Sequence, residues 1–235
     1  MSRPKALIEL NPSQIPPSAL VDRAYVDLKH RILTCKLRPG HRLIEKELCA
    51  EMGISRTPFR EALNRLGLEG LVSLVPYHGF EVAPITLQDI RDMCEFRGIV
   101  ESEGAALAAQ RATPEEIAEL VELAELPYTP GRRETYASYL RANSAFHLKM
   151  AHCSHNARLE AVVISLLDHL QRPLYLGLDV GLNPAAATAE HLAVVEAVRN
   201  RDPALAAAVM RKQVSAAEER MISAFRGSEL DEAKK

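Results

Sequence analysis

The sequence predicts a mainly α-helical protein, with an N-terminal winged helix-turn-helix followed by a C-terminal antiparallel bundle of six or seven helices. Three observations support this fold class. Short amphipathic segments separated by turn signals occupy residues 21–70. Two short apolar runs then flank a turn, which is typical of a β-hairpin. From residue 86 onward, apolar residues recur at helical spacing and no strand pattern stands out.

The composition is that of an ordinary globular protein. The 235 residues are 47% hydrophobic and 26% charged, with a formal net charge of −2. No apolar run approaches the roughly 20 residues that cross a bilayer, and the N-terminus lacks the apolar core of a signal peptide. The four cysteines show no CxxC pairing, as is typical of reduced thiols. We therefore expect a cytoplasmic protein that does not bind a membrane.

Charge is distributed unevenly along the chain. Residues 21–85 carry ten Lys and Arg against eight Asp and Glu, whereas residues 86–235 carry seventeen against twenty-two. A mildly basic head on an acidic body is compatible with nucleic acid at one end. The expected organisation is a flexible arm (1–20), a winged helix-turn-helix domain (21–85), an all-helical domain (86–227) and a tail (228–235).

The elements of the first domain follow from its turn signals. The segment VDRAYVDLKHRILTCKL carries an apolar stripe at helical spacing and ends at Arg38-Pro39-Gly40. A short second helix follows, with Gly53 as its expected C-cap and Ser55 as the expected N-cap of a third helix. Two short helices joined in this way form a helix-turn-helix. The runs LVSLV and GFEVA then flank residues 76–79, which predicts a wing of two strands.

The first turns of the predicted third helix carry Arg56, Thr57 and Arg60, away from its apolar face. A recognition helix directs its N-terminal residues to base edges in the major groove, where Arg can form paired hydrogen bonds to guanine. The helix N-terminus also favours phosphate. Solvated surface arginines are the alternative, but the preceding turn and the following wing favour DNA binding.

The run PGHRLIEKELCAEMGISRTPFREALNRLGLEGLV, together with the HG of the wing, resembles the DNA-binding domain of GntR-type bacterial transcription regulators. The motifs PG-x-RL-x-E-x-EL, GISRTPFREAL and EGLV stand in order at that family's spacing. Lys46 stands where relatives commonly carry Arg, and a point charge suits phosphate better than base readout. The resemblance implies that DNA is contacted by Lys46, Ser55, Arg56, Thr57, Arg60, His78 and Gly79.

The second domain is predicted to be entirely helical. A long helix begins near residue 87, and Thr113-Pro114-Glu115-Glu116 is a typical helix start. EFRGIVESEGAALAA, N-x-x-FH and EH-x-x-VVEAVRNRDPALAAAVM resemble the FCD-type effector domain of the FadR branch of this family. That domain commonly holds a divalent metal on one Asp and three His, and the metal binds a small carboxylate. Further helices are expected at roughly 133–152, 156–178, 186–200 and 203–225.

Four polar residues are predicted to point into the bundle. Asn143 and His147 share a helix face with apolar neighbours, and His191 lies on a valine stripe. Gln213 lies eleven residues after a turn at Asp202, and His191 lies eleven before it, so an antiparallel hairpin brings the two level. The nearby His152, Cys153 and His155 fall off the inward face and are expected at the surface or in packing.

The four inward positions are those of the family's metal ligands, with Asn143 in place of the Asp and Gln213 in place of the last His. Neutral amides are poor donors to Zn²⁺ or Ni²⁺, so no tightly bound metal is expected. A weakly held Zn or Ni on His147 and His191, with Asn143, remains an alternative. So does a polar cluster satisfied without a ligand.

Arg97 matches an Arg of the family's first effector-domain helix, which often faces an acidic ligand. The alternative is a surface ion pair with Glu101 at the i+4 position. Arg172 and His169 are further candidates that no motif fixes. The effector-binding residues expected from the sequence are Arg97, Asn143, His147, His191 and Gln213.

The sequence therefore predicts a transcription regulator rather than an enzyme. It is expected to bind a palindromic operator as a homodimer and to respond to a small effector, expected to be an organic acid. A metal-responsive regulator of the same fold is the alternative. A metal-dependent hydrolase built on His147 and His191 is disfavoured, because no carboxylate is expected in the cluster to act as a base.

Overall fold

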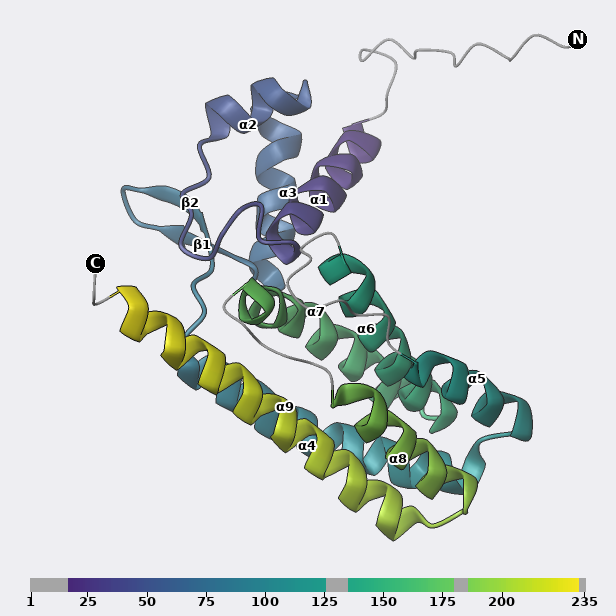
Figure 1. Cartoon of the computed structure of the whole chain (residues 1–235). Coiled ribbons are helices and arrows are strands. Elements are labelled where there is room, and N and C mark those ends of the chain that lie inside the picture. The colour runs from purple at the N-terminus through teal and green to yellow at the C-terminus, as the bar shows by residue number, and fades with distance from the viewer. Residues whose placement is uncertain (1–16, 126–134, 180–185, 233–235) are drawn as a thin grey trace, which may run out of the picture. The chain divides into compact units, whose positions relative to one another are not determined.

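The computed structural model describes residues 17–125, 135–179 and 186–232. The chain divides into two compact units. One extends to Pro84 but excludes Leu33–Cys35, and the other contains those three residues and continues from Ile85. Figure 1 shows the helices and strands of each unit. In the described ranges, no helix is both long enough and apolar enough to span a membrane.

From residue 17 onward, where its description begins, the first unit contains three helices and a two-stranded sheet: α1 (Pro17–Leu33), α2 (Glu45–Met52), α3 (Arg56–Leu68), β1 (Val72–Val75) and β2 (Gly79–Val82). The turn between α2 and α3 is made possible by Gly53, whose φ of 64° lies in the left-handed region. Glycine adopts this conformation without steric cost. Phe59, Leu63 and Leu66 of α3 are fully buried. The predicted helix-turn-helix is therefore confirmed.

The two strands form the predicted wing. They pair antiparallel with Val72 opposite Val82 and Val75 opposite Gly79. The segment before α2 adds a single β-bridge to this sheet, between Arg42 and Glu81. The sequence does not predict this bridge, because one bridging residue leaves no alternating pattern.

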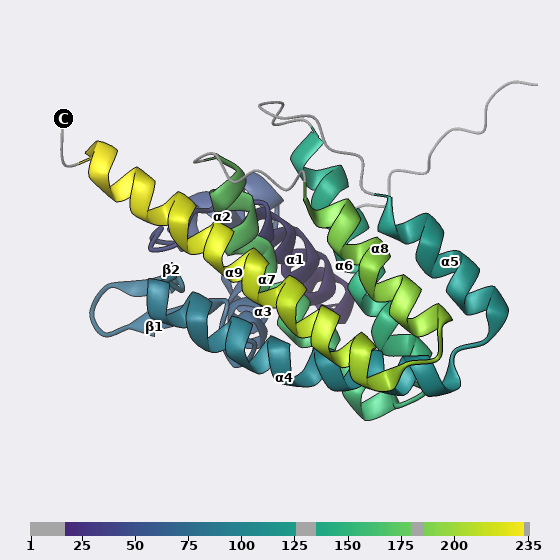
Figure 2. The same ribbon diagram turned by 60° about the horizontal axis from the view of Figure 1, so that its bottom comes forward.

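The described part of the second unit contains six helices: α4 (Leu87–Arg111), α5 (Pro114–Ala124), α6 (Tyr136–Cys153), α7 (Ala157–Asp179), α8 (Ala187–Arg199) and α9 (Pro203–Glu232). The two long helices α4 and α9 pack along each other, as Figures 1 and 2 show. Small buried residues of α4, among them Ala105, Ala108 and Ala109, allow this close approach. The bundle is completed around the same core by α5, α6, α7 and α8.

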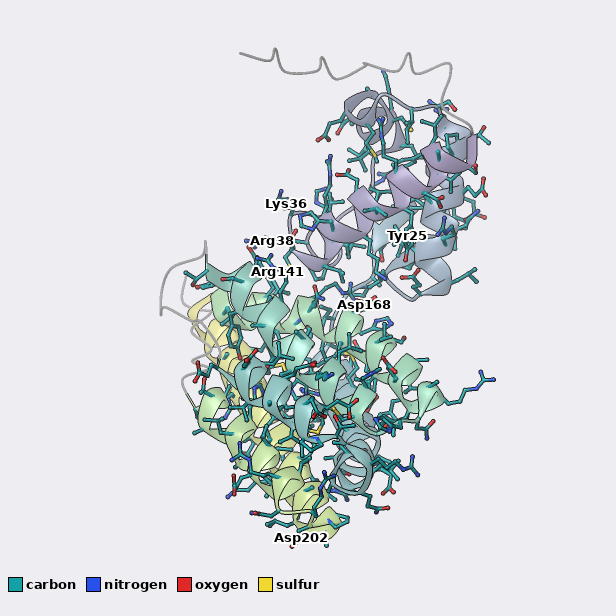
Figure 3. All side chains as sticks on the ribbon, turned by 90° about the vertical axis from the view of Figure 1, so that its right-hand side faces the viewer. Tyr25, Lys36, Arg38, Arg141, Asp168 and Asp202 are labelled. Carbon is teal, nitrogen blue, oxygen red and sulfur yellow. The ribbon has the colours of Figure 1, made fainter. Side chains whose placement is uncertain are left out.

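Helix ends in the second unit follow the predicted capping pattern. Thr113 and Glu116 form a capping box at the start of α5. Asp202 lies in the turn between α8 and α9, at the end of the bundle (Figure 3), and its side chain accepts a hydrogen bond of 3.0 Å from the Leu205 amide. The helical segments differ from the expected limits at both ends: α1 begins at Pro17, within the expected arm, and α9 continues to Glu232, within the expected tail.

Candidate functional site

The candidate DNA-binding residues of the first unit lie at the start of α2, at the start of α3 and at the tip of the wing. Lys46, Ser55, Arg56 and Thr57 are all exposed. Ser55 occupies the N-cap position of α3, but its side chain makes no capping hydrogen bond. Because Ser55 does not satisfy the first amides of α3, the positive end of this helix suits an anion such as phosphate.

Arg60 is oriented by a carboxylate of the preceding helix. Its Nε lies 3.1 Å and 3.0 Å from the two carboxylate oxygens of Glu45. This ion pair shows that the first turns of α2 and α3 are neighbours. The side chain of Arg60 is 58% exposed, so its guanidinium remains accessible to DNA.

The wing tip exposes His78 and Gly79, as well as a residue that the sequence analysis did not single out. Tyr77 is fully exposed and has a φ of 65°, a conformation that is rare for residues other than glycine. Gly79 has a φ of 86°. These two backbone conformations build the turn that carries the wing tip. That these side chains contact DNA remains a prediction.

The candidate effector site of the second unit is a cluster of buried polar side chains on four helices. Arg97 and Glu101 come from α4, and Asn143 and His147 come from α6. The remaining members are His191 of α8 and Gln213 of α9. Each of the six is at most 6% exposed. The predicted inward orientation of the four family positions is therefore confirmed, and their role in effector binding remains a prediction.

Arg97, Glu101 and His147 form a closed triad. Arg97 Nε donates to Glu101 Oε1 at 2.6 Å, and an Arg97 terminal nitrogen lies 2.7 Å from His147 Nε2. Because a guanidinium can only donate, His147 Nε2 must accept, which leaves the proton on Nδ1. Nδ1 lies 2.7 Å from Glu101 Oε2, although the two atoms are not aligned as a hydrogen bond. The triad is therefore neutral overall.

The electrostatics of the triad follow from burial and from its members. Burial raises the pKa of the Glu101 carboxyl, but the neighbouring Arg97 and His147 outweigh burial and lower this pKa to about 2. Burial lowers the pKa of His147 below its ordinary value. The imidazole is therefore neutral at pH 7, between a guanidinium cation and a carboxylate anion.

This geometry corrects two expectations. The alternative interpretation of Arg97 placed its ion pair with Glu101 on the surface, whereas both side chains are buried. The expectation that no carboxylate lies in the cluster was also wrong, because Glu101 is one of its members. Glu is rarely buried unless it is paired, and the sequence does not reveal that Arg97 and His147 both face it. Arg97 donates to one of its oxygens, and His147 Nδ1 lies 2.7 Å from the other.

His191 and Gln213 are brought together as the hairpin geometry predicts, with 3.5 Å between their Nε2 atoms. The ring of Phe146 stacks on His191 with a centroid distance of 4.0 Å. Burial, with the nearby His147 and Arg97, lowers the pKa of His191 to about 2. Among the described residues, His191 Nδ1 and Gln213 Oε1 have no hydrogen-bond partner although both are buried. A buried polar atom without a partner is destabilising by about 1–3 kcal/mol, so a polar ligand that reached the oxygen of Gln213 would be favoured.

The donor set does not fit a divalent metal. The Nε2 atom of His147 already accepts from Arg97 at 2.7 Å, and a guanidinium at that distance repels a second cation. Asn143 and Gln213 offer only neutral amide oxygens, which are weak donors to zinc or nickel. No group of three His, Cys, Asp or Glu side chains with the geometry for a metal occurs within the described ranges.

A narrow cavity adjoins the polar cluster. The space in which the centre of a water molecule fits has a volume of about 20 Å³, which is room for one water molecule. The surface of α8 and α9 carries a second, larger space, a groove whose volume by the same measure is about 360 Å³. Gln213 lines both spaces. The lining of the cavity is Arg97, Tyr139, Asn143, Leu174, Ala187, Gln213, Ala217 and Arg220.

Three residues of this region were missed by the sequence analysis: Tyr139, Glu190 and Arg220. Arg220 forms a bidentate ion pair with Glu190, and both of its contacts measure 2.7 Å. A signal was available, since Arg220 follows Gln213 by seven residues and so returns to the same helix face after two turns. The other candidates, Arg172 and His169, do not line the cavity.

The remaining histidines of the α6 region lie away from the cluster, as expected. His152 and His155 are 53% and 44% exposed, and His155 Nε2 lies 3.2 Å from a carboxylate oxygen of Glu116. Cys153 is fully buried in the core.

Comparison with known proteins assigns both units. Residues 20–82 match the model of bacterial regulatory proteins of the gntR family, and residues 92–216 match the FCD domain. The chain is 33% identical to an uncharacterized HTH-type transcriptional regulator in an unstable DNA locus of Streptomyces ambofaciens, over 82% of this chain and 80% of that protein. It is 34% identical to the HTH-type transcriptional regulator McbR of Escherichia coli, over 68% of this chain and 72% of McbR.

The fold agrees with these matches. The solved structure of E. coli McbR/YncC superposes with a TM-score of 0.70 at 25% sequence identity, over 88% of this chain and 98% of that one. The two family models account for the helix-turn-helix with its wing and for the helical bundle. The chain therefore belongs to the GntR family of bacterial transcription regulators, with a helical domain of the FCD type.

Proposed function

We propose that this regulator binds a palindromic operator as a homodimer and that a small organic acid, bound beside the buried polar cluster, changes its affinity for that operator. One observation carries the effector proposal. Two arginines line a cavity whose wall also holds Asn143 and the unpartnered carbonyl oxygen of Gln213. Guanidinium N–H groups donate hydrogen bonds to a carboxylate in the absence of a metal, and the Gln213 oxygen can accept a hydrogen bond from another polar group of the ligand.

The proposed DNA interface uses the exposed residues at the starts of α2 and α3 and at the wing tip. Arg56 and Arg60 would read base edges, while Lys46 and the uncapped amides of α3 would hold phosphates. A single recognition helix reads few base pairs, so a two-fold dimer on symmetric half-sites supplies the remaining specificity. We propose that the protein has no catalytic activity, because Arg97 holds both candidate bases of the cluster, Glu101 and His147.

Regulation requires that the effector and DNA sites be coupled. An effector that binds one conformation of the helical domain better than another shifts the population of that conformation. The same coupling requires that operator DNA change the affinity for the effector by the same factor.

Fluorescence anisotropy with labelled DNA from the promoter of the regulator's own gene tests the DNA proposal. The wild-type protein should prefer this DNA over a shuffled duplex, and the Arg56→Ala, Arg60→Ala double variant should lose the preference. The Arg158→Ala, Arg199→Ala double variant is the matched control, because it removes the same charge from two exposed arginines of the helical domain. Equal affinity for both duplexes in the wild-type protein would refute sequence-specific binding.

A thermal-shift screen with small organic acids and their uncharged amides tests the effector proposal. A ligand that binds only the folded state raises the melting temperature by mass action. We expect stabilisation by at least one acid and none by its amide, and a matching change in operator affinity. Stabilisation without any change in operator affinity would contradict a regulatory role for the site.

A further inference from the structure

The ion pair between Glu190 and Arg220 separates the narrow cavity from the groove on the surface of α8 and α9. Arg220 lines the cavity, Glu190 lines the groove, and Gln213 lines both. The two terminal nitrogens of Arg220 lie 2.7 Å from the two oxygens of Glu190. The side chains are 25% and 22% exposed, so the pair lies at the boundary between the interior and the solvent.

This geometry is the one in which an arginine binds a free organic acid. A planar guanidinium and a carboxylate form two parallel hydrogen bonds. The side chain of Glu190 occupies that position in the structure. An acid from solution can therefore take the same place on Arg220 only by displacing Glu190.

The two arginines of the cavity differ in how firmly their carboxylates are held. Glu101 is 3% exposed and contacts both Arg97 and His147, so its departure would leave a buried cation without a partner. Glu190 lies in the first turn of α8, and Arg220 is its one hydrogen-bonding side chain among the described residues. When Glu190 turns outward it reaches the groove and is hydrated, so the exchange is accessible only at Arg220.

Gln213 adds a second requirement for the ligand. Its side-chain oxygen is buried, has no partner within the described ranges and belongs to the wall shared by the cavity and the groove. A carbonyl oxygen accepts a hydrogen bond, so a hydroxyl group on the ligand would satisfy it. An acid without such a donor would leave this oxygen unsatisfied.

We infer that the Glu190 carboxylate competes with the ligand for Arg220 and keeps the cavity closed; we call this ion pair the latch. A small hydroxy acid replaces the Glu190 carboxylate on Arg220 and donates a hydrogen bond to the side-chain oxygen of Gln213. The inference rests on the proposed function, in which the helical domain binds an organic acid. With the latch closed the cavity holds about one water molecule, so release of Glu190 joins it to the groove and makes room for the ligand. The exchange also removes a link between α8 and α9.

Isothermal titration calorimetry with two matched pairs of acids tests the latch: 3-hydroxybutyrate against butyrate, and malate against succinate. Glu190→Gln removes the competing charge at nearly constant shape. Because a partly exposed ion pair contributes up to about 1 kcal/mol, the Kd for hydroxy acids should fall about fivefold in this variant. Arg220→Lys keeps the charge but loses the fork, and its Kd should rise about tenfold or more.

Glu196→Gln is the matched control, since Glu196 forms an exposed ion pair with Arg199 on the same helix. Its Kd should equal that of the wild type. Gln213→Met should reduce the preference for each hydroxy acid over its parent acid towards onefold. Circular dichroism checks that each variant is folded. Glu190→Asp has a shorter side chain that reaches the Arg220 guanidinium less well, so this variant should also bind hydroxy acids more tightly than the wild type.

The outcomes separate the latch from the proposed function. If the wild type binds these acids and Glu190→Gln binds them no more tightly, the latch is refuted and the effector class stands. If neither protein binds any of the four acids, the effector class proposed for this domain is refuted together with the latch. Equal affinity for the members of each pair in the wild type would refute the role of Gln213.

Discussion

Replacing Glu101 by Gln should destabilise the helical domain strongly. The substitution removes one negative charge at nearly constant volume and leaves Arg97, which is 1% exposed, without its anion. A buried cation cannot recover its hydration in the folded state. Breaking a buried pair from one side is destabilising by about 3–5 kcal/mol. The amide of Gln can still accept one hydrogen bond from Arg97, so the loss should lie near the lower limit.

The effect is large enough to measure by thermal or urea unfolding followed by circular dichroism at 222 nm. For a chain of this size, a loss of about 3 kcal/mol lowers the melting temperature by about 6–12 °C. Glu196→Gln is the control, because its pair with Arg199 is exposed on both sides, and it should change stability by less than about 1 kcal/mol. The double variant Arg97→Leu, Glu101→Leu should be more stable than Glu101→Gln, because it removes both charges.

The single variant Glu101→Gln and the double variant Arg97→Leu, Glu101→Leu together test whether the buried ion pair controls the stability of the helical domain. A loss below about 1 kcal/mol for Glu101→Gln would show that Arg97 finds other partners or water, and that the triad is not the electrostatic unit described above. A double variant less stable than the single one would show that the packing of these side chains outweighs the unpaired charge.

The other predictions concern pH, metal, DNA and the turn. Because the pKa of Glu101 is lower in the folded state than in the unfolded state, its ionisation stabilises the folded protein above pH 4.5, and this contribution is lost as the pH falls towards about 2. The difference in unfolding free energy between the wild type and Glu101→Gln should therefore narrow below pH 4.5 in urea titrations. Protein purified without an affinity tag should contain well below one equivalent of zinc or nickel by elemental analysis, and EDTA should not change its melting temperature. A stoichiometric metal whose removal lowers that temperature would refute the argument from the donor set. Glu45→Gln removes the anion beside Arg60 and should raise the affinity for DNA severalfold in anisotropy titrations, whereas an unchanged Kd would show that Glu45 does not compete with DNA. Gly53→Ala, at a φ of 64°, should be destabilising by about 1 kcal/mol in urea unfolding, and no loss would show that the turn relaxes.

Much of the fold was predictable because local rules determine it. Gly53 ends α2 in the left-handed conformation, and Asp202 caps α9 through its side chain, as their sequence context indicates. The turn at Asp202 also fixes the register of α8 against α9. That register is why His191 and Gln213 could be paired from their equal distances along the chain.

The composition of the site was less predictable, because it depends on which side chains four helices bring together. Glu101 looks like a surface residue until Arg97 and His147 are both found against it. Arg220 lies on the same face of α9 as Gln213, but the partner that holds it comes from α8. Pairings between helices depend on rotation and spacing in the bundle, and neither is encoded in the periodicity of one segment.

The cation of the polar cluster is the guanidinium of Arg97, which is part of the polypeptide itself and is balanced by Glu101. A chelator cannot extract it, a competing ion cannot exchange with it, and its occupancy is complete in every molecule. A regulator built on such a residue would keep the same pocket charge in zinc-starved and zinc-replete cells. Its response would then follow the concentration of its organic ligand alone, independently of the supply of trace elements.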